Sequence, residues 1–291
     1  MIHSMTGFGK AEKANGEKIF SVEIKALNGK QFDLQLKLPS LLKPMEIEIR
    51  QWLQEALVRG TVECVVQIKQ NGMSRPVSIN TDLVKAYYEQ ISQMAEANQM
   101  DTQSVLASIL RLPDVVSQVQ EVITPEDYSV FKIILEEALQ RINEHRQTEG
   151  MMLQKDLLAR MEAIRSQQKM VLSLEPNRGE RIRQELTALL EKHVGKENTD
   201  AIRLEQELIY YMEKIDIHEE QMRLEEHIRY FEEVLHHPDA SKGKKLSFIL
   251  QEVGREINTT GSKAYDISIQ KAVVVMKDEL EKAKEQVLNV L

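Results

Sequence analysis

The stretch KIFSVEIKALNGKQFDLQLKL, residues 18–38, decides the fold of the N-terminal part of the chain. Apolar residues alternate with polar ones along both of its halves, at Phe20, Val22, Ile24, Phe32, Leu34, Leu36 and Leu38. A period of two residues is the pattern of a half-buried β-strand. Between the halves, Asn28-Gly29 predicts a hairpin or a bulge, because these residue types adopt the backbone that tight turns need. The stretch therefore predicts two strands of a sheet.

The segments around this stretch complete a small domain. TVECVVQIKQ, residues 61–70, predicts a further strand and holds the only cysteine, Cys64, which we expect to be buried. Pro44 opens a helical stretch that runs to about Arg59, before Gly60 ends it. In SMTGFGKA, residues 4–11, two glycines allow a tightly bent strand or the close approach of another backbone. Strands with one helix are the pattern of an α+β domain.

Beyond this domain the apolar residues recur with helical spacing almost to the end of the chain. The predicted helices cover about 81–97, 102–111, 125–172, 178–193, 198–236 and 244–288, with one of the breaks at LEPNRGE, residues 174–180. We therefore expect an α+β protein of two domains. These are an N-terminal α+β domain at 1–75 and a helical domain with extended antiparallel helices at 76–291.

The composition is that of a folded, helix-rich protein. Among 291 residues, 42% are hydrophobic and 29% are charged. A single cysteine excludes a disulfide framework within the chain, which fits a reducing compartment. The first residues lack the apolar core of a signal peptide, and no run is long enough to cross a membrane. A cytoplasmic protein is the expectation.

Two basic segments lie within an acidic chain. The net charge is −8, but residues 1–80 hold 11 basic and 8 acidic residues, a surplus of +3. Residues 241–265 hold five basic and two acidic residues, again +3. An acidic protein is no general nucleic-acid coat, but local basic segments can hold phosphates. From charge alone, two solvated faces explain the pattern equally well.

The first stretch with candidate chemistry is DIHEEQMRLEEHIRYFEEVLHH, residues 216–237. Glu220 and His227 lie seven residues apart, so they share one helical face, with Arg223 between them. That face borders an apolar stripe, which places both side chains at the edge of the core. A glutamate and a histidine in this setting can bind a divalent metal. The alternative is a solvated acidic face with an incidental histidine.

The second such stretch is LSFILQEVGREINTTGSK, residues 246–263. Glu252 and Glu256 lie one turn apart, and like charges at this spacing oppose each other by about 0.2–0.5 kcal/mol. If the two helices face each other, these carboxylates converge with Glu219, Glu220 and His227. Such an oxygen-rich set suits Mn²⁺ or Mg²⁺. The alternative, a network of ion pairs between the helices through Arg223 and Arg255, fits the spacing equally well.

Polar residues after Glu256 have no evident packing role. Asn258, Thr259, Ser262 and Lys263 offer hydrogen-bond donors suited to phosphate or sugar oxygens. The alternative is a helix kink with local hydrogen bonds from side chains to the backbone. SKGKK, residues 241–245, is a weaker phosphate-binding candidate, since an ordinary solvated turn explains it as well.

Six segments, taken in order, resemble the signatures of the YicC-like (YicC/YloC) protein family. They are MTGFGKA at 5–11, VEIKALNGKQFDLQLKLP at 22–39, RGTVECVVQI at 59–68, RQTEGMMLQKDL at 146–157, DIHEEQMRLEEHI at 216–228 and GKKLSFILQEVGREINTTGSKA at 243–264. The resemblance covers essentially the full chain. It implies a metal-dependent endoribonuclease that assembles as a hexamer. In such an assembly the N-terminal domain at 1–75 would serve oligomerisation and form a ring or RNA channel. The helical domain at 76–291 would carry the metal and RNA site, and its arms would close over RNA.

The resemblance also implies which residues act. In the helical motifs these are Glu219, Glu220, Arg223, His227, Glu252, Arg255, Glu256, Asn258 and Lys263, and in the N-terminal block Thr6, Lys10, Lys25 and Asn28. Two places depart from the family pattern. Gly29 and Lys30 stand where a polar residue and an arginine are usual, and Ser247 stands where an aspartate is common. Lysine cannot fork onto a phosphate as arginine does, which weakens RNA positioning there.

The leading hypothesis is a divalent-metal-dependent endoribonuclease acting on single-stranded or structured RNA. The predicted metal ligands are Glu219, Glu220, His227, Glu252 and Glu256, with Arg223 and Arg255 as further catalytic residues. The predicted RNA-binding residues are Thr6, Lys10, Lys25, Asn28, Lys244, Lys245, Asn258 and Lys263. One alternative is an RNA-binding adaptor that presents RNA to another nuclease. Another is a purely structural helical assembly. Aromatic residues, at 5%, are too few to suggest a base-stacking platform.

Overall fold

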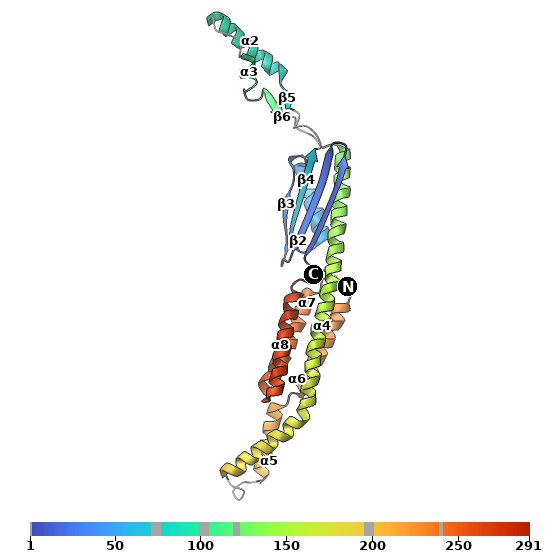
Figure 1. Ribbon diagram of the computed structural model, residues 1–291, viewed down its shortest axis with the longest axis vertical. Helices are drawn as coiled ribbons and strands as arrows, with labels where there is room; N and C mark the ends of the chain where they lie inside the picture. Colours follow the sequence, from blue (N-terminus) through green and yellow to red (C-terminus); the bar gives the residue numbers. More distant parts are fainter. Residues whose placement is uncertain (1, 71–76, 99–104, 119–122, 195–200, 239–240) are drawn as a thin grey trace.

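The protein is a four-stranded sheet followed by a long helical region, as the sequence predicts for an α+β fold (Figure 1). The computed structural model describes residues 2–70, 77–98, 105–118, 123–194, 201–238 and 241–291. The predicted domain boundary after residue 75 lies outside these residues. The region beyond it is not wholly helical: β5 (Val77–Ile79) pairs with β6 (Val116–Gln118), next to α2 (Thr81–Asn98) and α3 (Val105–Ile109).

The sheet has the order β1-β2-β4-β3. Its strands are β1 (Gly7–Asn15), β2 (Lys18–Leu27), β3 (Phe32–Lys37) and β4 (Gly60–Gln70). β2 pairs antiparallel with both β1 and β4, whereas β3 pairs parallel with β4. The predicted strand segments are therefore confirmed, but the hairpin predicted at Asn28-Gly29 is wrong. β4 lies between β2 and β3, and the hairpin instead joins β1 to β2 through Gly16, whose φ is +59°.

One face of the sheet is covered by helices. α1 (Glu46–Leu57) follows a 3₁₀ turn, η1 (Ser40–Met45), so the predicted helical stretch from Pro44 is present. It packs its apolar side into a core that α4 completes from residues 131–142. Cys64 is buried in this core, as expected, and burial raises the pKa of its thiol to about 12. The other face of the sheet carries mostly polar side chains, with a few apolar ones such as Phe8, because alternate residues of each strand point away from the helices.

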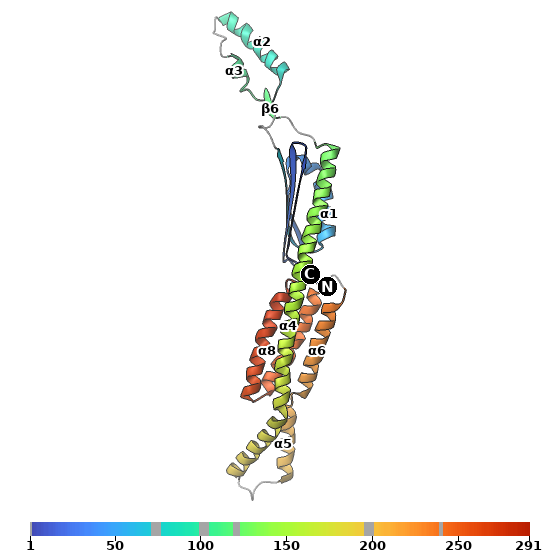
Figure 2. The same ribbon diagram turned by 45° about the vertical axis from the view of Figure 1, so that its right-hand side comes forward.

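α4 (Pro125–Val194) is a single helix of 70 residues that runs through both halves of the molecule (Figures 1 and 2). The break predicted at LEPNRGE is wrong, because the helix continues through Pro176. A proline inside a helix costs about 3 kcal/mol through a lost hydrogen bond and a clash. Helical packing on both sides of Pro176 offsets that cost, with Val171 and Arg178 both buried. α4 bends in its C-terminal half (Figure 2). This half contains Pro176, and proline is a common cause of helix bends.

Four further helices complete the helical region. They are α5 (Ala201–Ile215), α6 (His218–His236), α7 (Gly243–Lys263) and α8 (Ile267–Val287). The continuous helices predicted at 198–236 and 244–288 are each divided in two, and residues 198–200 and 239–240 lie outside the described ranges. α6, α7 and α8 pack with the middle of α4 around a second core, which includes Leu157, Met161, Ile164, Leu224, Ile228, Phe231, Leu250, Val253, Ile257, Met276 and Leu280. α4 thus joins two separate cores.

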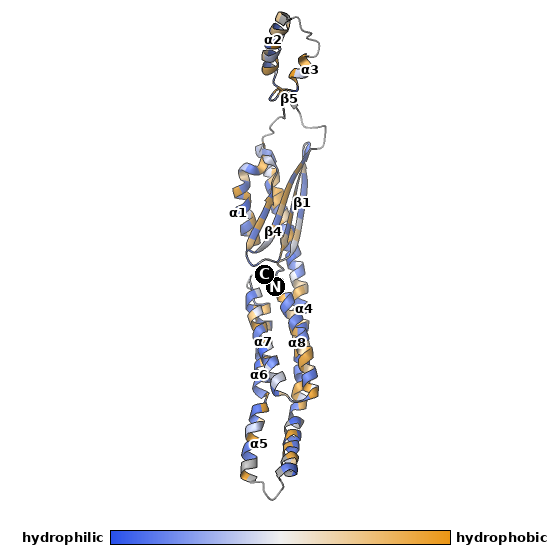
Figure 3. Cartoon of the chain, turned by 90° about the vertical axis from the view of Figure 1, so that its left-hand side faces the viewer, coloured by the Kyte–Doolittle hydropathy of each residue, from blue (hydrophilic) through white to orange (hydrophobic). Residues whose placement is uncertain are grey.

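The two ends of the chain meet between these cores (Figure 2). Ser4 forms a bridge with Val290, the amide of Met5 donates to the carbonyl of Asn289, and the amide of Leu291 donates to the carbonyl of His3. Figure 3 shows hydrophilic and hydrophobic residues mixed along the helices. Among the described residues, no helix combines the length and apolar character needed to cross a membrane.

Candidate functional site

The predicted acidic residues lie where α6 and α7 pack against each other. The start of α6 meets the end of α7, so the two helices run antiparallel. Lys263 Nζ lies 2.7 Å from Glu220 Oε1, and Gln221 Nε2 donates to Thr260 Oγ1 at 2.8 Å. We call the line along which these helices meet the α6–α7 seam, and define it by Glu220, His227, Lys245, Glu252, Glu256 and Lys263.

Helix geometry places these side chains in two rows. On α7, Glu252, Glu256 and Lys263 follow Lys245 by seven, eleven and eighteen residues, which are close to two, three and five full turns. On α6, Glu220 and His227 are separated by seven residues, about two turns. The Glu220–Lys263 contact joins the ends of the two rows. The seam therefore brings together the two motifs that the sequence singled out.

Glu220 is at the seam's buried end. Its side chain is 7% exposed and forms an ion pair with Lys263, which is 31% exposed. The second carboxylate oxygen, Oε2, is buried and has no hydrogen-bond partner within the described part of the chain, and neither has Gln221 Oε1 beside it. A buried carboxylate oxygen without a partner is costly, because it has lost its water. This end of the seam therefore has unused capacity to bind a positive group.

Glu256 is also buried, with an exposed fraction of 4%. Within the described residues its carboxylate takes part in no hydrogen bond or ion pair. His227 is half-buried on α6, while Glu252 is exposed. The prediction that Glu220 and His227 lie at the edge of the core holds for His227, whereas Glu220 is buried more deeply than expected. Unlike Glu220 Oε2, the Glu256 oxygens are not among the described polar atoms that are both fully buried and unpartnered, so this carboxylate keeps some access to solvent.

The arginines of both motifs pair within their own helices. Arg223 contacts Glu219 at 2.5 Å, and Arg255 lies 3.8 Å from Glu252. All four side chains are at least half exposed, with fractions of 50–74%. The ion pair across the helices is instead Glu220–Lys263. Arg223 and Arg255 therefore do not neutralise the buried carboxylates, and their guanidinium groups face solvent.

The seam does not by itself form a complete metal centre. Across the ranges that the structure describes, no three histidine, cysteine, aspartate or glutamate side chains come together in a group able to hold a metal ion. The donor types nevertheless fit a divalent metal, since carboxylates and an imidazole are available and Glu220 Oε2 has no partner among the residues that the structure describes. Joint metal binding by Glu219, Glu220, His227, Glu252 and Glu256 stays a prediction.

The basic residues near the start of α7 divide into two kinds. Lys242, part of the SKGKK candidate, is buried and donates to the carbonyls of Leu235 and His237. It therefore caps the end of α6 and takes part in the turn between the helices. Lys244 and Lys245 are exposed, as is Asn258 farther along α7. These three remain available to a ligand.

The predicted N-terminal residues lie apart from the seam. Lys10 and Lys25 are exposed on the sheet face that α4 does not cover. Thr6 Oγ1 donates to Glu149 Oε2 at 2.7 Å, and Asn28 Nδ2 donates to the carbonyl of Leu288 at 2.8 Å. These two side chains therefore hold the joint where the chain ends meet. Their predicted role in RNA binding is not tested by these contacts.

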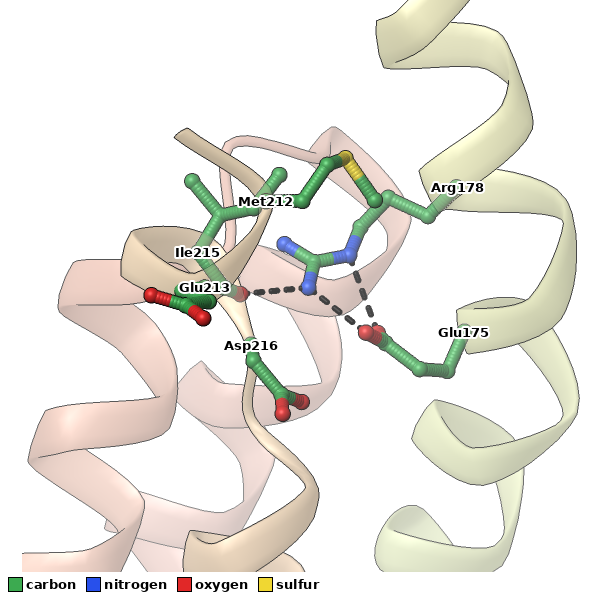
Figure 4. A pocket seen from close by; sticks show the side chains of 6 residues that line it. All are labelled: Glu175, Arg178, Met212, Glu213, Ile215 and Asp216. Carbon is green, nitrogen blue, oxygen red and sulfur yellow. Dashed lines mark hydrogen bonds and ion pairs between the residues drawn. The ribbon is translucent and has the colours of Figure 1, made fainter. Parts of the chain in front are cut away.

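Sequence reasoning missed Arg178, which contacts the α6–α7 seam at the backbone of Lys263. Arg178 of α4 is 2% exposed and pairs with Glu175 (Figure 4). It donates to the carbonyl of Ile215 at 2.6 Å and to that of Lys263 at 3.4 Å. It lines a pocket of about 290 Å³ between α4 and α5. In the sequence, Arg178 lies within LEPNRGE, a stretch that predicts a break in the helix and not a buried contact.

Comparison with known proteins matches the whole length of the chain. Residues 2–155 match the family described as "Endoribonuclease YicC-like, N-terminal region", and residues 171–291 match "Endoribonuclease YicC-like, C-terminal". The chain is 30% identical over 295 residues to a probable endoribonuclease YicC of Clostridioides difficile, with 100% of both chains covered. It is 28% identical over 295 residues to a probable endoribonuclease YicC of Haemophilus influenzae, with 99% of both covered.

Proposed function

The chain belongs to the endoribonuclease YicC-like family, and from this premise we propose that it is a metal-dependent endoribonuclease whose site is the α6–α7 seam. The observation that carries this placement is a pair of largely buried glutamates, Glu220 and Glu256. Within the described residues, Glu220 Oε2 has no hydrogen-bond partner, and the Glu256 carboxylate takes part in no hydrogen bond or ion pair. Both lie on a surface that also presents Lys263 and His227.

Glu220, His227, Glu252 and Glu256, with Glu219 beside them, would hold the divalent metal, Mn²⁺ or Mg²⁺. When bound, such an ion supplies a Lewis acid for a phosphate oxygen and lowers the pKa of its water. Because no three of these donors form a group within one described chain, binding requires side-chain movement or a second copy. The hexamer implied by the family resemblance would supply such copies.

The basic residues of the seam would bind and orient the phosphodiester. Lys263 lies 2.7 Å from Glu220, so its ammonium group is held close to the carboxylates. Arg223 of α6 and Arg255 of α7 are exposed beside the seam and can donate paired hydrogen bonds to phosphate oxygens. Such donors stabilise the charge that develops on the phosphate. Lys244, Lys245 and Asn258 would hold the strand along α7.

The decisive experiment removes one buried charge with little change of shape. The variant Glu256→Gln is compared with Glu281→Gln, which changes an exposed glutamate of α8 outside the seam. Cleavage of a labelled RNA is followed with Mn²⁺, with Mg²⁺ and with EDTA. We expect wild type and Glu281→Gln to cleave with metal only. We expect Glu256→Gln to lose at least about tenfold in rate, since lost metal-site groups cost that much.

Two further readouts separate catalysis from folding and from binding. Mn²⁺ should raise the melting temperature of wild type and Glu281→Gln more than that of Glu256→Gln, because a ligand stabilises the state that binds it. RNA affinity in EDTA should be retained by all three proteins. Equal cleavage by Glu256→Gln and wild type would refute the assignment of the site.

A second candidate function is an RNA-binding adaptor that cleaves nothing itself. The observation in its favour is that the described residues of one chain form no three-donor group. It predicts that clean wild-type protein binds RNA but leaves it intact with either metal. In that outcome the carboxylates are structural, and the endoribonuclease proposal fails.

A further inference from the structure

Two aromatic rings stand exposed beside the seam, and each has a lysine ammonium near its face. Tyr230 of α6 is 43% exposed and Phe248 of α7 is 55% exposed. Lys245 Nζ lies 5.2 Å from the centroid of the Tyr230 ring, and Lys244 Nζ lies 6.0 Å from that of Phe248. Neighbouring lysines in the chain therefore reach rings on two different helices.

Helix geometry places both rings on the same side of the seam. Tyr230 follows Arg223 by seven residues, and Phe248 precedes Arg255 by seven, so each ring shares a row with an exposed arginine. In α6 this outer row is offset by three residues from the row of Glu220 and His227. In α7 it is offset by three from Lys245 and Glu252. The two helices run in opposite directions, so an offset of three residues from the seam turns each outer row toward the same side of the helix pair. Tyr230 and Phe248 therefore lie on one face.

We propose that Tyr230 and Phe248 form a base-stacking platform for single-stranded RNA, with Lys244 and Lys245 binding the adjacent phosphates. The proposal rests on the function proposed above and extends it by naming where the strand is held. The platform adjoins the carboxylates, since the eight residues from Phe248 to Glu256 span about 12 Å along α7. A strand stacked on the rings would extend toward Glu256.

The chemistry of the surface favours RNA over a protein partner. A stacked base has a π-face that any aromatic ring can accept, and a phosphate on each side that a lysine can bind. A protein interface would need a contiguous apolar core around the rings. The neighbours by helical spacing are instead charged or polar: Glu226, His227 and Glu233 around Tyr230, and Lys244, Lys245, Gln251 and Glu252 around Phe248.

The sequence has too few aromatic residues to predict a stacking platform, and the proposal departs from that expectation because of where these two rings lie. Other exposed rings have a lysine partner too: Phe8 with Lys25 on the sheet, and Tyr210 with Lys214 on α5. The first pair joins two neighbouring strands and the second lies within one helix, and each is a single pair. The pairs that include Tyr230 and Phe248 lie on packed helices, and both of their lysines belong to the basic segment 241–265.

The test measures stacking directly, in EDTA so that the RNA stays intact. An oligonucleotide of about 10 nucleotides carries 2-aminopurine, whose fluorescence falls when the base stacks on a ring. Wild type is compared with Tyr230→Ala, Phe248→Ala and the double variant. Tyr210→Ala is the matched control, because it removes a ring of similar exposure with its own lysine partner. A second oligonucleotide lacks the bases but keeps the phosphates.

We expect RNA affinity to fall about fivefold or more for each ring removed, with loss of the fluorescence change. Tyr210→Ala should bind like wild type, and the oligonucleotide without bases should not distinguish the variants. Unchanged affinity in the double variant, with wild type binding and cleaving RNA, would overturn the platform and leave the proposed function standing. If wild type stacks the labelled base but does not cleave RNA when Mn²⁺ or Mg²⁺ is present, the platform is supported and the proposed endoribonuclease function is refuted. A change of oligomeric mass without a change of RNA affinity would assign the rings to a contact between copies.

Discussion

At the scale of single residues, Gly9 decides how closely α4 approaches the sheet. Gly9 is buried on the covered face of β1. A Cβ atom built there would lie 2.2 Å from the carbonyl oxygen of Ala138 and 2.8 Å from the amide nitrogen of Ile142. Both are backbone atoms of α4, so no side chain can move aside. The close approach that the glycines of SMTGFGKA allowed is therefore real at this position.

We predict that Gly9→Ala forces α4 away from β1 and destabilises the protein by about 1–3 kcal/mol, the usual cost of overpacking. The apparent melting temperature should fall by roughly 2 °C or more. Lys10→Ala is the matched control, since Lys10 is the next residue of the same strand and faces solvent. Equal melting temperatures for the two variants would contradict the close packing.

At the scale of elements, Asp266 separates α7 from α8. It is the N-cap of α8, and its carboxylate accepts hydrogen bonds from the amides of Ser268 and Ile269. Arg181 of α4 forms an ion pair with it. The hydrogen bond from Arg181, together with those two amides, holds the pKa of the Asp266 carboxyl below its usual value. One side chain thus begins a helix and anchors it to α4.

The lowered pKa predicts how stability depends on pH. A carboxyl whose pKa is lower in the folded state contributes stability above its unfolded pKa, near 3.9, and loses it as the pH falls through the folded value. Asp266→Asn keeps a good N-cap but removes the charge, so it should be less stable than wild type at pH 7, by up to about 1 kcal/mol. That difference should shrink near pH 3.5.

Asp266→Ala provides the contrast, because it removes the cap as well as the charge. We expect its additional loss of about 0.5–2 kcal/mol to persist at both pH values. Denaturant unfolding of the three proteins at pH 7 and near pH 3.5 measures both effects. A difference between wild type and Asp266→Asn that stays constant with pH would show that the charge contributes nothing.

At the scale of the whole molecule, two cores are joined at the place where the chain ends meet α4. The amide of Ser4 donates to the carbonyl of Arg146 at 3.0 Å. Gly150, one turn farther along, lets the N-terminal segment lie directly on the helix, since a Cβ there would be 2.1 Å from the carbonyl oxygen of Ile2. The fully buried Arg146 side chain donates to the carbonyls of Leu57, Met5 and Arg59. The joint thus depends on backbone contacts to α4.

We predict that Gly150→Val opens this joint without unfolding either core. The amides of Ser4, Met5 and Leu291 should exchange hydrogen at least about tenfold faster, as expected for a local opening made easier by 1.4 kcal/mol. Amides of β2, β4 and α8 should keep their protection. Met151→Ala, which changes an exposed neighbour on the same helix, is the control. Unchanged exchange at all three amides would refute the prediction.

The sequence by itself determined the kinds of element and the residues of the two helical motifs. Alternation in residues 18–38 and 61–70 predicted strands, because burial of one face of a strand is a local requirement. The seven-residue spacing of Glu220 and His227 predicted one helical face, because seven residues are close to two turns of a helix. Resemblance to a family predicted the activity class. The first two predictions depend on residues close together in the chain, and the third depends on motifs spread along it.

Only the tertiary structure decided how these elements pair. Asn28-Gly29 had the pattern of a hairpin, but β4 pairs with β2 and excludes β3, because strand order depends on the most favourable partner in the whole sheet. Pro176 had the pattern of a break, but packing on both sides of α4 outweighs its local cost. The burial of Glu256 and the position of Lys245 over Tyr230 likewise arise from contacts between helices, which spacing along one helix does not specify.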